Sequence, residues 1–157
     1  MPVKFSDKEI EGMIAEAKTL PADFRSLIRV KPKQGHKERE LDFAGKSGNA
    51  FRLILRQNNI NPLDFSIILA YCPPKRTQIF RLCRYNGKSH EHTNDIEGNT
   101  FYQFHIHRAT ERYQALGARE DTYAEPTDRF SDYNSALECL LEDCRFELPD
   151  KRQGRLF

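Results

Sequence analysis

No stretch of the sequence is apolar for long enough to cross a membrane. Every apolar run falls well short of the roughly 18 residues that a membrane-spanning helix needs. The opening residues MPVKFSDKEIEG carry neither the apolar core nor the small-residue cleavage site of a signal peptide. Internal repeats and low-complexity tracts are also absent. We therefore expect a cytoplasmic protein that makes no contact with a membrane.

Cysteine is scarce and widely spaced. The four cysteines, Cys72, Cys83, Cys139 and Cys144, form no CxxC pair of the kind that binds zinc or catalyses thiol exchange. A protein without an export signal is expected to keep its thiols reduced. We therefore interpret these residues as buried thiols and expect no disulfide framework.

Length and composition indicate one folded domain. A chain of 157 residues can bury a core of its own but is short for two domains. Charged residues make up 31% of the sequence, yet Phe, Ile, Leu and Tyr are plentiful enough to exclude a disordered composition. We expect a single domain over residues 1–148 and a flexible tail over 149–157.

The N-terminal segment carries the signals that start and stop a helix. Ser6 can serve as the N-cap, with Glu9 as its capping-box partner three residues later. Apolar residues then recur at helical spacing from Ile10 to Leu20, and Pro21 ends the pattern. This helix is expected to cover a core.

From residue 26 onward the apolar pattern alternates with a period of two. Such alternation predicts strands, and the short connections between them favour an antiparallel meander. A second long helix is predicted over 131–144 with Ser131 as its cap, and a shorter one over 109–117. We therefore expect an α+β domain, in which a sheet of about five or six strands packs against an N-terminal and a C-terminal helix. The predicted strands are 26–31, 37–43, 50–57, 64–72, 77–85 and 101–108.

Four of the five histidines form two His-x-His pairs, His90/His92 and His105/His107. The first pair falls in a predicted loop, whereas the second lies on the strand predicted over 101–108. Alternation on that strand places both histidines on its polar face, roughly 6 to 7 Å apart at the backbone, with Ile106 on the core face. A hairpin would bring the loop back over this strand, so we expect the two pairs to be neighbours.

Three uses of the histidines stay open. The two pairs could bind zinc or another transition metal, with Glu91 or Asp95 as a further ligand. They could instead catalyse RNA cleavage without a metal, because imidazoles can move protons to and from a ribose hydroxyl and a leaving oxygen. In the third interpretation they are surface side chains that contact a partner.

Basic and aromatic residues flank the histidines. Arginine pairs with phosphate through two hydrogen bonds, and tyrosine stacks on bases or donates its hydroxyl. Lys and Arg outnumber Asp and Glu by 18 to 12 in residues 1–110, but not in 111–157, where they count 7 against 11. This pattern favours a phosphate-bearing partner such as RNA. The flanking residues are Arg81, Arg84 and Tyr85 before the histidines, and Arg108 and Arg112 after them.

The same region resembles a known motif. Residues 84–86 (RYN), 90–92 (HEH) and 104–107 (FHIH) resemble the core of TumE-like toxins of bacterial toxin-antitoxin pairs. In those toxins an R-Y-D triplet precedes a histidine-rich loop and an H-x-H strand; here Asn86 replaces the Asp. The resemblance covers residues 78–108 and implies an mRNA-directed ribonuclease that a cognate antitoxin neutralises. The whole chain also resembles a bacterial family of unknown function of similar length.

We therefore expect a small RNA-acting protein of bacterial or mobile-element origin, most simply a metal-independent endoribonuclease toxin without a cofactor. A non-enzymatic module that binds a protein, such as an antitoxin or a phage-encoded inhibitor, is the alternative. The expected catalytic residues are His90, His92, His105, His107 and Tyr85; the expected substrate-binding residues are Arg81, Arg84, Arg108 and Arg112.

Overall fold

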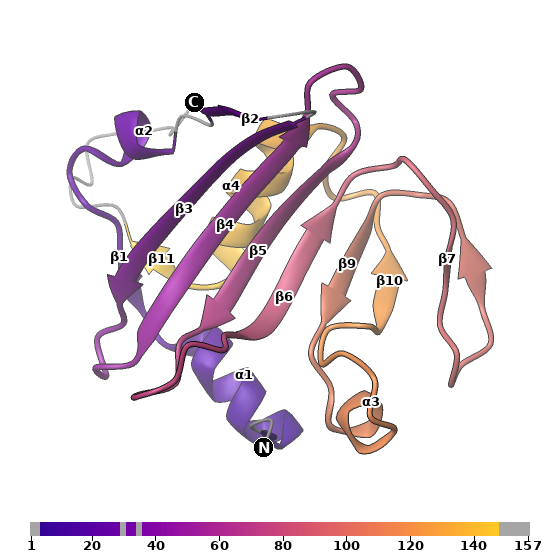
Figure 1. The fold of residues 1–157 in the computed structure, drawn as a ribbon, viewed down its shortest axis with the longest axis horizontal. Helices are drawn as coiled ribbons and strands as arrows, with labels where there is room; N and C mark the ends of the chain where they lie inside the picture. The colour runs from indigo at the N-terminus through magenta and orange to yellow at the C-terminus, as the bar shows by residue number, and fades with distance from the viewer. Residues whose placement is uncertain (1–3, 29–30, 34–35, 148–157) are drawn as a thin grey trace.

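The fold is built on a seven-stranded antiparallel sheet, whose strands run side by side across Figure 1 in the order β10-β9-β6-β5-β4-β3-β2. The computed structural model describes residues 4–28, 31–33 and 36–147. This sheet confirms the predicted α+β meander and exceeds the predicted number of strands, because the short β10 adds to the outer side of β9 and the short β2 pairs with β3. The strands are β2 (Lys31–Lys33), β3 (His36–Ala44), β4 (Ala50–Asn58), β5 (Phe65–Tyr71), β6 (Phe80–Asn86), β9 (His105–Arg108) and β10 (Ala124–Pro126).

One face of the sheet forms the core. Apolar residues that alternate along β4 and β5 meet in register, with Leu53 opposite Leu69 and Leu55 opposite Ile67, and none of the four is exposed to solvent. Helices α1 (Asp7–Ala15) and α4 (Tyr133–Asp143) contribute buried residues to this core, and Figure 1 shows α4 behind the strands and α1 below their lower ends. Helices at both ends of the chain thus bury the same side of the sheet.

The helix starts and stops differ from the predictions in two places. The capping box of Ser6 and Glu9 is present, but α1 ends at Ala15 and not near Leu20. At the start of α4, Asp132 is the N-cap, in place of the predicted Ser131, because the Asp132 carboxylate accepts the backbone N–H of the third helical residue. In the part of the chain that the structure describes, no helix is long and apolar enough to span a membrane.

Residues 18–19 form strand β1 (Lys18–Thr19) in place of the last predicted helical turn. β1 pairs in parallel with β11 (Phe146–Glu147), which directly follows α4. The Lys18 side chain is completely buried, and the three N–H groups of its ammonium are shared among four backbone carbonyl oxygens that lie 2.7 to 3.1 Å from Nζ. These carbonyls belong to Met13, Ile14, Glu16 and Cys144. Tertiary hydrogen bonding therefore overrides the helical apolar pattern here.

The predicted strand over 26–31 is wrong. Phe24–Leu27 forms the short helix α2, and residues 29–30 lie outside the described part of the chain. The predicted short helix over 109–117 is present as α3 (Glu111–Ala115). The expected tail over 149–157 also lies outside the described residues.

A small hairpin stands apart from the main sheet. β7 (His92–Thr93) and β8 (Thr100–Phe101) pair with each other and not with the seven strands, and Figure 1 shows β7 beyond β10. We refer to residues 92–101 as the β7–β8 hairpin. The Glu97 carboxylate fastens it to α3, because it accepts the Tyr113 hydroxyl at 2.6 Å. Most of the predicted strand 101–108 is thus divided between this hairpin and β9.

Gly87 lies where the chain leaves β6 for the hairpin, and it is packed against backbone. A Cβ at this position would stand 1.8 Å from the carbonyl oxygen of Leu63. We expect Gly87→Ala to lower the free energy of unfolding by about 2 kcal/mol in urea denaturation, because backbone cannot yield as a flexible side chain can. Gly12→Ala is the matched control: nothing lies within 4 Å of its added methyl, so a more helix-prone residue should stabilise α1 by up to about 1 kcal/mol. Equal stability of the two variants would contradict this packing.

Candidate functional site

Three histidine rings meet on the face of the sheet opposite the helices. His105 and His107 project from β9, and their ring centroids lie 4.9 Å apart. His92, from the β7–β8 hairpin, lies 4.8 Å from His107 and 5.7 Å from His105. We call these three residues the histidine cluster. His90 stays outside it: its side chain is exposed and bonds with Ser89.

The cluster is buried, whereas the sequence predicted an exposed polar face. The predicted alternation is correct, since Ile106 packs toward the core between the two histidines. Yet only 1% of His105 and 4% of His107 is accessible to solvent. The hairpin covers them with the rings of His92 and Phe101. The alternation of side chains shows which face of a strand a residue is on. It does not show whether a segment later in the sequence, or between strands, covers that face.

Backbone carbonyls fix the protonation pattern of the two β9 histidines. His105 Nδ1 lies 2.9 Å from the carbonyl oxygen of Gln103, and His107 Nδ1 lies 2.9 Å from that of Asp121. A carbonyl oxygen only accepts, so both Nδ1 atoms carry the proton and both Nε2 atoms are free of one in the neutral rings. Burial lowers the pKa of His105 to about 4 and that of His107 to about 2. Both imidazoles are therefore neutral near pH 7.

A buried ion pair borders the histidines. Arg84 faces the cluster from β6, directly opposite His107 in the register of the sheet. Its Nε lies 3.3 Å from Oδ2 of Asp121. The Asp121 side chain is fully buried, and its other oxygen, Oδ1, accepts a 2.7 Å hydrogen bond from Arg119. The Arg84 charge is the second cause, after burial, that lowers the pKa of His107. Asp121 was not among the predicted site residues, because nothing in its sequence spacing links it to the histidines.

Several polar atoms beside the cluster have spare hydrogen-bonding capacity. Asn86 is 5% exposed and places its amide nitrogen 3.5 Å from Nε2 of His105. Its Oδ1 atom is buried without a hydrogen-bond partner among the described residues, and Nε of Arg84 and Oδ2 of Asp121 have no partner there besides their 3.3 Å ion pair with each other. Such atoms are rare in a folded protein unless a ligand or water satisfies them. The site is thus equipped to bind a polar group.

Comparison with known proteins assigns the chain to a family but supplies no activity. A model described as a family of unknown function, DUF6978, matches residues 5–146. The chain belongs to this family. No curated protein and no solved structure matches it significantly. The matched range contains all three histidines of the cluster and Arg84, so the site lies within the family domain.

Two predicted site residues lie on the other face of the sheet. Tyr85 pairs with Ile106 and Arg108 with Cys83, so both side chains point toward the helices. The Tyr85 hydroxyl donates to Asp143, and its ring stacks on Phe130 with centroids 5.9 Å apart. The structure therefore separates Tyr85 and Arg108 from the histidine cluster.

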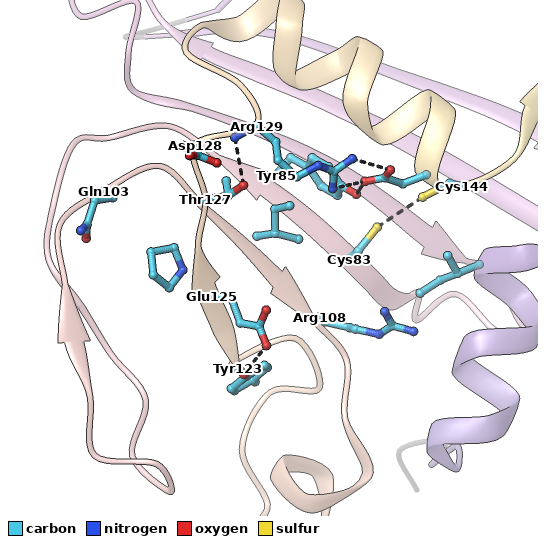
Figure 2. A pocket seen from close by; sticks show the side chains of 14 residues that line it. Cys83, Tyr85, Gln103, Arg108, Tyr123, Glu125, Thr127, Asp128, Arg129 and Cys144 are labelled. Atoms are coloured by element: carbon cyan, nitrogen blue, oxygen red, sulfur yellow. Dashed lines mark hydrogen bonds and ion pairs between the residues drawn. The ribbon is translucent and has the colours of Figure 1, made fainter.

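A cavity of about 810 Å³ lies on this helix-covered face and includes Tyr85 and Arg108 in its lining. Arg129, which is labelled in Figure 2, also lines the cavity and donates two hydrogen bonds of 2.7 and 2.9 Å to the carboxylate of Asp143. Glu125 and Asp128 add two exposed carboxylates to its rim. Carboxylates therefore outnumber guanidinium groups, which makes this cavity unsuited to a phosphate backbone.

The remaining predicted arginines are engaged in ion pairs. Arg112 bonds to Glu97 of the hairpin at 2.7 Å and lies 4.5 Å from the ring centre of Tyr123. Arg81 pairs with Glu120 at 3.8 Å. Of the four predicted substrate-binding arginines, the structure thus brings only Arg84 to the cluster.

The metal interpretation finds no ready-made site. Among residues 4–28, 31–33 and 36–147, no group of three or more His, Cys, Asp or Glu side chains is arranged to hold a metal ion. The neutral imidazoles would suit a metal chemically, and Glu91 and Asp95 remain the predicted additional ligands. Metal analysis of untagged protein tests this interpretation directly.

Proposed function

We propose that the protein is a metal-independent endoribonuclease that acts in the cytoplasm, as the toxin of a bacterial toxin-antitoxin pair. The observation that carries the proposal is the convergence of His92, His105 and His107 beside the guanidinium of Arg84. RNA cleavage by the ribose 2′-hydroxyl needs a group to take its proton, a donor for the leaving oxygen and a cation for the charged phosphorane. Imidazoles and a guanidinium supply all three kinds of group.

The burial of the cluster refines the roles in this proposal. His105 and His107 are neutral at pH 7 because of their low pKa values, so in the free protein neither is a proton donor. Their bare Nε2 atoms accept hydrogen bonds from a hydroxyl, and a phosphate beside them raises their proton affinity. His92 is half-exposed and connects the cluster to solvent. We assign hydroxyl binding to the β9 pair and charge stabilisation to Arg84. We assign proton transfer to His92, which takes the proton of the 2′-hydroxyl and gives it to the leaving oxygen as the bond from phosphorus to that oxygen breaks.

Substrate entry requires a movement of the β7–β8 hairpin. The two β9 histidines are almost completely enclosed, whereas a phosphodiester needs direct contact with the catalytic groups. The hairpin makes no strand pairing with the main sheet, so a shift breaks its side-chain bonds to α3 and β10 but not the ladder between β6 and β9.

Cleavage of a labelled RNA in the presence of EDTA tests the proposal. We expect His92→Gln and His107→Gln to slow cleavage more than tenfold, because each removes an imidazole from the cluster. His90→Gln is the matched control, since this exposed histidine lies outside the cluster; it should cleave at the wild-type rate. Growth inhibition in bacterial cells should follow the same order.

Three outcomes would overturn the proposal. The first is unchanged cleavage by the double variant His92→Gln, His107→Gln. The second is cleavage of an all-deoxy substrate as fast as the RNA, because the mechanism needs a 2′-hydroxyl. The third is loss of activity in EDTA with recovery when zinc is added. This result would show that the protein catalyses cleavage with a metal ion and not by the proposed proton transfer.

A protein-binding module is the second candidate, and the charge pattern of the open sheet face favours it. Arginines on this face pair with carboxylates and do not form a continuous basic surface for RNA. A protein partner of mixed charge would suit such a face. This candidate predicts a stoichiometric complex and no cleavage of RNA by the free protein. The pairs are Arg52–Asp42, Arg56–Glu38, Arg81–Glu120 and Arg84–Asp121.

A further inference from the structure

Asn94, which lies on the β7–β8 hairpin and is 1% exposed, uses the full hydrogen-bonding capacity of its side-chain amide. Its Nδ2 donates to the carbonyl oxygen of Ala124 at 2.7 Å and to Oδ1 of Asn99 at 3.0 Å. Its Oδ1 accepts the backbone N–H of Ala124 at 3.0 Å and lies 2.9 Å from Nε2 of His92. An amide side chain can make two donor and two acceptor contacts, and here all four are made.

The backbone of Ala124 determines which way this amide points. A backbone N–H only donates and a backbone carbonyl only accepts, so Oδ1 and Nδ2 of Asn94 cannot exchange places. The atom that faces His92 is therefore an oxygen, which only accepts. It follows that Nε2 of His92 carries a proton, and that in the neutral ring Nδ1 is the unprotonated nitrogen.

We propose that Asn94 is a positioning residue, which sets the tautomer of His92 so that its Nδ1 is available for proton exchange. Carbonyl groups fix the other two members of the cluster in the same manner, through Gln103 and Asp121. Each neutral imidazole of the cluster then presents one bare nitrogen. The tautomer itself is a property of the free protein, whereas its use in catalysis rests on the proposed function.

Asn94 has a second role, because both atoms of its amide also hold the hairpin to Ala124, Oδ1 through the backbone N–H and Nδ2 through the carbonyl oxygen. Nδ2 clamps the hairpin to the outer edge of β10 at Ala124 and braces the hairpin turn at Asn99. Only Oδ1 contacts His92. Asn94→Asp therefore keeps the oxygen that accepts from His92 but removes the two hydrogen bonds that Nδ2 donates. Asn94→Ala removes all four side-chain hydrogen bonds of Asn94.

Nitrogen-15 NMR of the histidine rings tests the inference in the free protein, without RNA. In the wild type we expect the neutral form of the His92 ring to carry its proton on Nε2, as the long-range proton–nitrogen couplings report. Asn94→Asp should keep this tautomer, whereas Asn94→Ala should convert His92 to a mixture of both tautomers. Asn99→Ala, which removes one partner of Nδ2 but leaves the His92 contact, is the matched control and should match the wild type.

A wild-type spectrum with the His92 proton mainly on Nδ1 would overturn the inference, even if no variant folds. So would an Asn94→Ala spectrum identical to the wild type. In RNA cleavage we expect Asn94→Ala to be about tenfold slower than Asn99→Ala. If the NMR result is as expected and no variant or wild-type protein cleaves RNA, the positioning role stands and the proposed ribonuclease activity fails.

Discussion

The free energy of unfolding should fall by about 4 kcal/mol when the pH is lowered from 6.5 to 4.5. His105 and His107 account for this fall, with about 2 kcal/mol for each imidazole. Burial lowers the pKa of these side chains from 6.5 to about 4 and about 2. In this pH range the unfolded chain binds protons on both imidazoles, while the folded protein keeps them neutral. The unfolded state thus takes up more protons, and stability falls as the pH falls.

Urea denaturation at several pH values between 4.5 and 6.5 measures this effect. The double variant His105→Gln, His107→Gln should lose most of the pH dependence, because glutamine does not titrate. His90→Gln is the control and should keep the wild-type slope, since its side chain is exposed in the folded protein. Asp143, whose pKa lies below its ordinary value of 3.8, loses its contribution only at lower pH. Parallel pH profiles of wild type and double variant would show that the two histidines are not buried as neutral groups.

Replacement of Lys18, which lies away from the histidines, should be strongly destabilising. Lys18→Ala removes the ammonium that four carbonyl oxygens surround, and it leaves a cavity between the rings of Phe51 and Phe146. Unsatisfied buried carbonyls and a lost long side chain together should lower the free energy of unfolding by about 3 to 5 kcal/mol.

Lys46→Ala is the matched control for this lysine. Lys46 forms a 2.6 Å ion pair with Glu147, but both side chains are at least half exposed. Exposed ion pairs contribute at most about 1 kcal/mol, so thermal and urea denaturation should separate the two variants clearly. A Lys18→Ala protein as stable as Lys46→Ala would mean that the carbonyls around Lys18 find other donors.

The sequence predicted the parts of the fold that depend on interactions between residues close together in the chain. The capping box at Ser6 and the alternation along β4 and β5 needed no knowledge of distant residues. The end of α1 could not be foreseen, because Lys18 leaves the helical pattern to bond with Cys144 at the other end of the chain. The strand predicted over 26–31 was wrong because a short alternating stretch does not distinguish a strand from a single helical turn, and residues 24–27 form α2.

The three histidines of the candidate site could be predicted from the sequence, but the residues that surround them could not. Strand alternation alone could have excluded Arg108, because it directly follows His107 and so points to the opposite face. Excluding Tyr85 required the register, which places Arg84 and not Tyr85 opposite His107. Asp121 and Asn94 come from segments that fold over the sheet, and no spacing in the sequence connects them to the cluster.

The parallel pairing of β1 with β11 bears on the order in which the protein folds. The strands β3 to β6 are joined by short turns and can pair as soon as each emerges from the ribosome. Lys18 pairs with Phe146, so β1 must wait until almost the whole chain has been made. Contacts between residues this far apart in sequence are slow to form. We therefore expect the central sheet to fold first and the N-terminal segment to dock last, which leaves newly made chains open to proteases near residue 18.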